Sequence, residues 1–188
     1  IMEQATLCTL LPGTAAVIGG MLVLAGCAAS FAMFRSLDFA DIVDLPFDRQ
    51  AVFCVMWFAI GILGVLVEVL LTARAAKRQG LSPTIRSARV AAFALTPSVV
   101  VAMVLTVRFL GPIEPQREEV RYIAPVWMML YGTAVYTAGL FSIRPPRVLG
   151  LTFIALGVLA LMAFPAYGVL AAALSFGMLH IAFGCYIL

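Results

Sequence analysis

Long apolar runs recur along the whole chain, separated by short segments that carry charge, proline or glycine. Each run holds about twenty residues, enough to cross the hydrocarbon core of a bilayer as one helix. The pattern predicts six membrane-spanning helices, at about 13–34, 51–73, 89–110, 122–142, 147–165 and 167–187. Strong helix terminators separate them: Asp44-Leu45-Pro46, Gly80-Leu81-Ser82-Pro83, Gly111-Pro112, Pro145-Pro146 and Pro165.

Composition agrees with a membrane protein. The 188 residues are 64% hydrophobic and 11% charged, whereas a soluble domain carries about a quarter charged residues. No hydrophilic segment is long enough for a separate soluble domain. The sequence therefore predicts one all-α transmembrane domain, residues 1–188, folded as a six-helix bundle.

Charge in the connecting segments predicts the orientation. The segments after the second and fourth runs carry only basic residues: Arg74, Lys77, Arg78, Arg86 and Arg89 in one, Arg144 and Arg147 in the other. The segments after the first and third runs mix arginine with aspartate or glutamate. Since basic segments stay in the cytoplasm, both termini are expected there. Topology thus explains the formal net charge of +3, and no nucleic-acid partner is expected.

The first external segment has an amphipathic pattern. On a helix, one side would carry Asp38, Asp41 and Asp48, and the other Phe39, Ile42 and Val43. This arrangement favours a short helix lying on the outer membrane surface. A divalent-cation site is the alternative, but the aspartate spacing does not match a calcium loop, and no metal site is predicted.

Glycine spacing is the most specific feature of the last three runs. Each run holds two glycines seven residues apart, on one side of a helix: Gly132 and Gly139, Gly150 and Gly157, Gly177 and Gly184. Small residues let membrane helices approach closely, and a seven-residue period favours near-antiparallel packing. The last three runs are therefore expected to pack together through their glycines. The first three runs show no such period.

Four stretches of the second half carry a resemblance: WMMLYG from Trp127, GLFSIR from Gly139, GLTF from Gly150 and FGMLHIAFG from Phe176. Together they resemble an uncharacterised family of small bacterial multi-pass inner-membrane proteins. The resemblance covers roughly the last third of the chain. It implies a bacterial inner (plasma) membrane location, and it implies no activity, cofactor or catalytic residue.

Two ionisable residues lie inside the predicted spans, Glu68 and His180, and such residues are the first functional candidates in a membrane protein. They are a candidate intramembrane pair, acting either as a proton relay or as a contact between helices. The alternative is that each is hydrogen-bonded for packing alone. For His180, the nearest expected partners are Tyr131, Thr133, Tyr136 and Thr137. One histidine provides too few ligands for a metal or haem site, so no cofactor is predicted.

Two further positions are candidates for special roles. Pro97 interrupts the third span and is a candidate hinge, although a static kink explains it equally. Cys27 ends LAGC, which resembles a lipobox, but the apolar run continues to Phe34 and favours a membrane helix. The other cysteines, Cys8, Cys54 and Cys185, are scattered singly and predict no metal or redox site.

Enzyme motifs such as HExxH, GxSxG and the P-loop are absent from the sequence. The sequence therefore favours a non-enzymatic accessory or scaffold subunit of a membrane assembly. Its expected partners are the lipid bilayer and either another membrane protein or further copies of the chain. The alternative is a small-solute transporter or substrate-binding membrane subunit with a pocket near Glu68 and His180.

Overall fold

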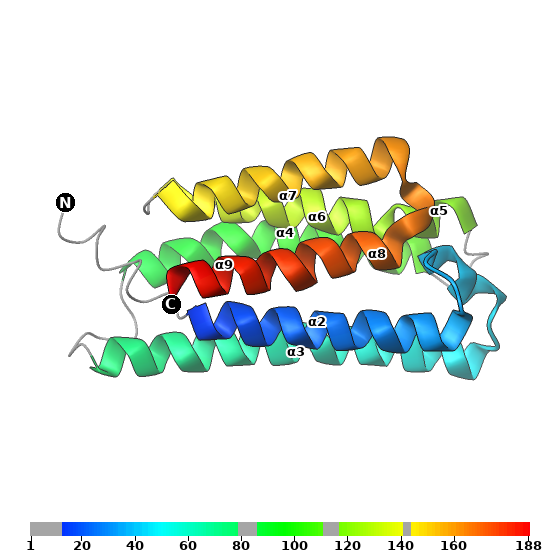
Figure 1. The fold of residues 1–188 in the computed structure, drawn as a ribbon, viewed down its shortest axis with the longest axis horizontal. Coiled ribbons are helices and arrows are strands. Elements are labelled where there is room, and N and C mark those ends of the chain that lie inside the picture. The colour runs from blue at the N-terminus through cyan, green and yellow to red at the C-terminus, as the bar shows by residue number, and fades with distance from the viewer. Residues whose placement is uncertain (1–12, 79–85, 111–116, 141–143) are drawn as a thin grey trace.

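In the computed structural model of the chain, residues 13–78, 86–110, 117–140 and 144–188 are described, and every regular element within them is helical (Figure 1). The long helices are α2 (Gly13–Phe34), α3 (Phe47–Arg78), α4 (Arg86–Leu110), α6 (Ile123–Gly139) and α7 (Arg144–Ala163). The last long segment combines α8 (Gly168–Ala172), the π-helical η3 (Ala173–Leu179) and α9 (His180–Ile187). Short helices η1 (Phe39–Asp44), α5 (Arg117–Arg121) and η2 (Pro165–Tyr167) connect them.

Five helical segments are long and apolar enough to cross a membrane: Gly13–Phe34, Phe47–Arg78, Phe93–Leu110, Arg144–Ala163 and Pro165–Ile187. The predicted all-helical class is therefore confirmed for the described residues, and the length and composition of these five segments fit a multi-pass membrane protein. The fourth predicted span differs, since α6 has only 17 residues, about 26 Å of helix, at the lower limit for crossing. The end of that predicted span, with Cys8 and the breaks at 80–83 and 111–112, lies outside the described residues.

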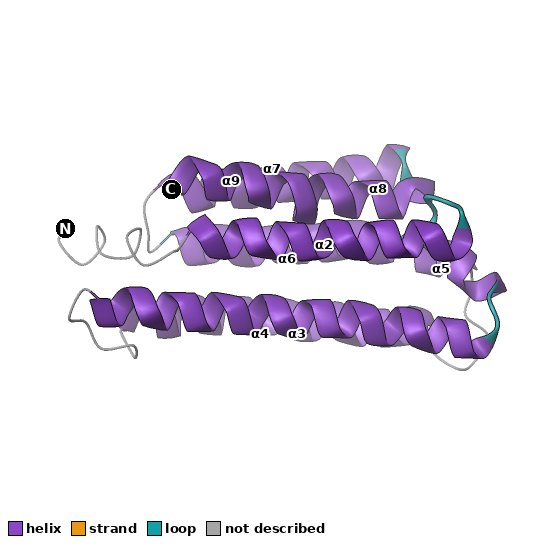
Figure 2. Ribbon diagram, turned by 60° about the horizontal axis from the view of Figure 1, so that its bottom comes forward, coloured by secondary structure: helices purple, strands orange, loops and turns teal. Residues whose placement is uncertain are grey.

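The long helices form two rows. One row runs α3, α2 and α9, and the other α4, α6 and α7, with close backbone contacts between neighbours in each row (Figure 2). The beginning of α2 and the end of α9 lie together at one end of the bundle (Figure 1), here called the terminal end. The opposite end, the η1 end, holds η1 and α5.

Glycine brings α6 and α7 together. A Cβ atom added at Gly132 would lie 2.7 Å from the Gly150 carbonyl oxygen, and one added at Gly150 would lie 2.5 Å from the Tyr136 nitrogen. Gly157 faces Met128 and Met129 at similarly short range. At the end of the pair, Arg147 donates from Nε to the Gly139 carbonyl at 2.7 Å. Only glycine permits this approach of the two backbones.

The third glycine pair packs elsewhere than the sequence predicted. A Cβ at Gly20 would lie 2.6 Å from the Gly177 carbonyl oxygen, and one at Gly184 would lie 2.5 Å from the Gly13 carbonyl oxygen. Gly177 and Gly184 therefore contact α2, in the other row from α6 and α7. Gly13 and Gly20 are also seven residues apart, a period that the sequence analysis missed because Gly13 stands at the very start of its run.

Large side chains fill the space between the rows. A buried cluster of Met128, Leu149 and Phe153 from α6 and α7 meets Phe176, Leu179 and Phe183 from η3 and α9. Phe153 is completely buried. Thus glycine sets the spacing within a row, whereas aromatic and long aliphatic side chains set the wider spacing between rows.

The segment between α2 and α3, for which the sequence predicted an amphipathic helix, closes the η1 end. Phe39 and Ile42 are buried against Phe53 of α3, Val120 of α5 and Val169 of α8, and the Val169 amide donates to the Leu37 carbonyl at 2.9 Å. The apolar side of the segment thus faces the bundle, and not a membrane surface as the pattern suggested. Apolar residues of α3, α5 and α8 thus cover the apolar side of this short helix.

The aspartates of this segment pair with arginines of α5. Arg117 forms ion pairs with Asp41 and Asp44, and Arg121 binds Asp38 at 2.8 Å and Glu118 at 2.6 Å. These pairs raise the pKa of both guanidinium groups, chiefly through the hydrogen bonds to Asp44 and Asp38. The aspartates therefore join the two loops of the η1 end, which is the role that the sequence analysis did not assign to them.

The Gly132–Gly150 contact gives a direct test. Gly132→Leu is expected to lower the free energy of unfolding of the detergent-solubilised protein by about 1–3 kcal/mol, because the new side chain meets backbone that cannot move aside. The control is Gly19→Leu, since a Cβ at Gly19 meets no described heavy atom within 4 Å. Thermal melting of both variants decides: equal melting temperatures would contradict the glycine contact.

Candidate functional site

Tyr131 and His180 form the one side-chain hydrogen bond that connects α6 with α9 among the described residues. The Tyr131 hydroxyl lies 2.8 Å from Nε2 of His180. The two residues belong to different rows, so the bond crosses the space between the rows. Of the four partners expected for His180, the structure selects Tyr131.

Aromatic rings surround this hydrogen bond. The centre of the Phe153 ring lies 4.9 Å from the centre of the Tyr131 ring and 5.2 Å from that of the His180 ring, in edge-on contacts. The Phe176 ring stacks on His180 at 6.1 Å, with an angle of 15° between the planes. The rings fix both polar side chains and lower the local polarity, which strengthens a hydrogen bond made there.

The π-helical turn of η3 positions His180. The sequence placed His180 on the same side as Gly177 and Gly184, as in an α-helix. A π-turn is wider than an α-turn, so residues three apart no longer share one side. Gly177 therefore faces α2, while His180 points to α6 and α7.

One ring nitrogen of His180 has no hydrogen-bond partner. Nδ1 is buried and forms no hydrogen bond with any described residue. If the Tyr131 hydroxyl donates to Nε2, the proton of a neutral imidazole sits on Nδ1, and if the hydroxyl accepts, the proton sits on Nε2.

Glu68 is not hydrogen-bonded to His180 in the described structure. Its one hydrogen bond comes from the Thr72 hydroxyl, at a long 3.5 Å. No hydrogen bond joins Glu68 to Tyr131 or His180 among the described residues. The predicted Glu68–His180 pair is therefore at most indirect.

Two tryptophans form hydrogen bonds that the sequence analysis did not anticipate. Trp57 of α3 donates to the Ser30 hydroxyl of α2 at 3.1 Å, and Trp127 of α6 donates to the Thr106 hydroxyl of α4 at 2.8 Å. Each bond joins neighbours within one row. A hydroxyl inside an apolar run opposite a tryptophan is the signal that could have suggested them.

The remaining candidates lie in ordinary helix. Pro97 is exposed within α4, which continues through it. Cys27 is buried in the middle of α2, and that helix continues to Phe34. Within the described ranges, no three His, Cys, Asp or Glu side chains lie close enough together to hold a metal ion.

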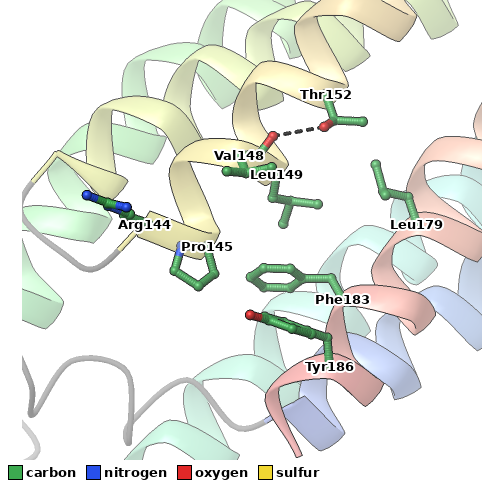
Figure 3. Close-up of a pocket in the computed structure, with 8 residues that line it drawn as sticks. All are labelled: Arg144, Pro145, Val148, Leu149, Thr152, Leu179, Phe183 and Tyr186. Carbon is green, nitrogen blue, oxygen red and sulfur yellow. Dashed lines mark hydrogen bonds between the residues drawn. The ribbon is translucent and has the colours of Figure 1, made fainter.

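A cavity of about 400 Å³ lies between α7 and α9 (Figure 3). Its lining is mainly apolar, and neither Glu68 nor His180 contributes to it. The pocket expected near those two residues is thus not the one described here. Comparisons with protein-family models, curated proteins and solved structures found no match to the chain. Fold and site together define a helical bundle of the multi-pass membrane type.

The Tyr131–His180 contact predicts a non-additive pair of substitutions. Tyr131→Phe leaves Nε2 without a partner and is expected to lower the free energy of unfolding by about 1–3 kcal/mol. Adding His180→Leu, of similar volume, removes the unpartnered nitrogen and should restore part of that loss. Melting of the two single variants and the double variant in detergent measures the coupling. Strictly additive losses would contradict a packing role for the bond.

Proposed function

We propose that this chain is a non-enzymatic accessory or scaffold subunit that binds another membrane helix along one face of α3. The observation that carries the proposal is the exposure of that helix. None of the residues in the most apolar stretch of α3 is buried. Outside the contacts of Phe53, Trp57 and Ile60 near the η1 end, α3 has few neighbours among the described residues.

Glycines on α3 are open, unlike those of α6, α7 and α9. A Cβ at Gly61 or Gly64 would meet no described heavy atom within 4 Å. Gly61, Gly64 and Glu68 follow Trp57 at steps of three and four residues, so they continue the side of α3 that Trp57 turns toward α2, beyond the point where the contacts of Trp57 end. This face combines small residues, which favour close helix contact, with a carboxyl group.

The carboxyl group supports a protein partner over lipid alone. Ionisable side chains at bilayer depth almost always face protein or water, because exposure to hydrocarbon is unfavourable. Within this chain Glu68 is only partly buried, with Thr72 as its hydrogen-bond donor. A helix packed along Gly61 and Gly64 would cover Glu68 and could supply a second donor.

For the chain as a whole, we infer six spans with both termini in the cytoplasm of a bacterial inner membrane. The side-by-side positions of the start of α2 and the end of α9 support an even number of crossings, which requires α6 to cross as well. The end of α3 and the beginning of α7 lie at the terminal end (Figure 1), and these helix ends carry Arg74, Lys77, Arg78 and Arg144. That placement supports a cytoplasmic terminal end.

Reporter fusions test this orientation. A fluorescent protein that folds only in the cytoplasm is expected to be active at either terminus, and a phosphatase active only outside is expected to be inactive at both. Opposite results at the two termini would contradict six spans.

A second candidate, a small-solute or proton carrier, is favoured by one observation. The Tyr131–His180 hydrogen bond lies among aromatic rings, and the buried Nδ1 of His180 has no hydrogen-bond partner among the described residues. The two functions differ in what Glu68→Gln does. A carrier would lose transport or a proton signal at unchanged stability, whereas the accessory role predicts weaker assembly.

The accessory role predicts a selective effect of Gly64→Leu. Gently solubilised from native membranes, the wild-type chain is expected in a stoichiometric complex with a second membrane protein or a second copy. Gly64→Leu should weaken that complex by roughly fivefold to a hundredfold, since overpacking of about 1–3 kcal/mol converts to that range. Native mass spectrometry measures the complex.

The melting temperature of the isolated chain serves as the internal control, because a Cβ added at Gly64 meets no described heavy atom within 4 Å. Gly19→Leu, another open glycine but on α2, is the matched variant that should leave the complex intact. A wild-type chain without any partner, or a complex equally sensitive to both variants, would contradict the proposal.

A further inference from the structure

The cavity between α7 and α9 is open at the edge of the two rows. Its walls come from Pro145, Val148 and Leu149 on one side and from Leu179, Phe183 and Tyr186 on the other. In Figure 3 the rings of Phe183 and Tyr186 point from α9 toward Pro145 and Leu149. Leu149, Leu179 and Phe183 belong both to this lining and to the apolar cluster between the rows, so the groove lies beside that cluster.

The lining changes in polarity along its length. Arg144 lies at one end of the cavity, and the Tyr186 hydroxyl points toward that same end (Figure 3). Toward the other end lie Leu149, Leu179 and Thr152, whose hydroxyl already donates to the Val148 carbonyl at 2.9 Å. One end is thus polar and basic, and the rest is apolar.

Arg144 has no compensating charge within the described part of the chain. It is exposed and forms no ion pair there. It is also the first residue of α7, where the helix dipole is positive and disfavours a cation. Arg147, by contrast, is engaged with the Gly139 carbonyl. Arg144 therefore adds no stability to its own helix, and an anion bound at this end would balance its charge.

We propose that this groove binds one anionic phospholipid, with an acyl chain between α7 and α9 and the phosphate against Arg144. An apolar groove in a bilayer cannot remain empty without losing the contacts of its lining atoms, and lipid is the molecule present in excess. The guanidinium matches the geometry of a phosphate. The volume of about 400 Å³ lies within the roughly 300–1,000 Å³ of small-molecule pockets. This site is separate from the α3 face and does not depend on the proposed function.

The test is lipid retention by the purified full chain. The protein is equilibrated in detergent with equal amounts of phosphatidylglycerol and phosphatidylcholine of identical acyl chains and examined by native mass spectrometry. We expect one retained lipid, with phosphatidylglycerol favoured about fivefold, as one arginine near an anionic group provides. Arg144→Gln should bring the ratio close to one. Arg78→Gln, at the same end but outside the groove, should leave it unchanged.

Blocking the groove provides the second arm. Val148 is an exposed residue of the lining, so the indole ring of Val148→Trp can occupy the groove. This variant should abolish retention of both lipids. Leu151→Trp is the matched control, since Leu151 is exposed on α7 but does not line the groove.

Three results would overturn the proposal. The wild-type chain retains both lipids equally; Arg78→Gln and Arg144→Gln reduce the preference alike; or the spectra show a dimer that Val148→Trp dissociates, which would assign the groove to a second copy.

Discussion

The close approach of glycine to backbone in two pairs of helices is the constraint on which the rest of the structure depends. In the α6–α7 pair it occurs at Gly132 and Gly150, and in the α2–α9 pair at Gly20 and Gly177. Lipid tails are as apolar as leucine, so helices in a bilayer gain little from burying apolar surface and depend on close packing instead. Each glycine pair fixes two neighbours within one row. The rows themselves then need a different kind of contact.

That contact is made by large side chains in the middle and by charge at the η1 end. Phe153 and Phe176 hold the rows apart at a distance that a tyrosine and a histidine can bridge, which is where the Tyr131–His180 bond lies. At the η1 end, Arg121 and Asp38 join α5 to the segment between α2 and α3 over a buried apolar cluster. Toward the terminal end, the groove beside Arg144 lies between α7 and α9, next to Leu149 and Phe183 of the cluster between the rows. The polar pair is thus best understood first as part of the packing between rows.

The outer edge formed by α3 and α4 has the weakest support. Their backbones do not approach each other closely over the described residues, although they follow each other in sequence. α4 is held by α6, partly through Trp127 and Thr106, and α3 by α2, partly through Trp57 and Ser30. An edge of this kind is suited to a partner, since the helix that would bind there displaces only lipid.

The sequence predicted the elements well and their neighbours poorly. Apolar run length located α2 at its observed bounds and the other long helices to within a few residues, because run length and helix terminators are local properties. Gly177 and Gly184 were assigned to the wrong neighbours, since spacing shows which residues share a side of a helix and not which helix that side meets. His180 was misplaced because the π-turn of η3 has no clear local signal in the sequence. Asp38 and Arg121 pair although they lie 83 positions apart in the sequence. Their pairing could have been predicted only from the opposite charges of two loops at the same end of the bundle.

The account claims that glycine contacts hold α6 against α7 while α3 and α4 are held loosely at the edge. Distances between spin labels in lipid test that claim most directly, with labels at the exposed positions Thr133 and Leu151 for the first pair and Val65 and Val104 for the second. In a background without other cysteines, the account predicts a narrow distribution for α6–α7 and a clearly broader one for α3–α4. Equally narrow distributions would show that α3 and α4 are fixed to each other without a partner, and would contradict it.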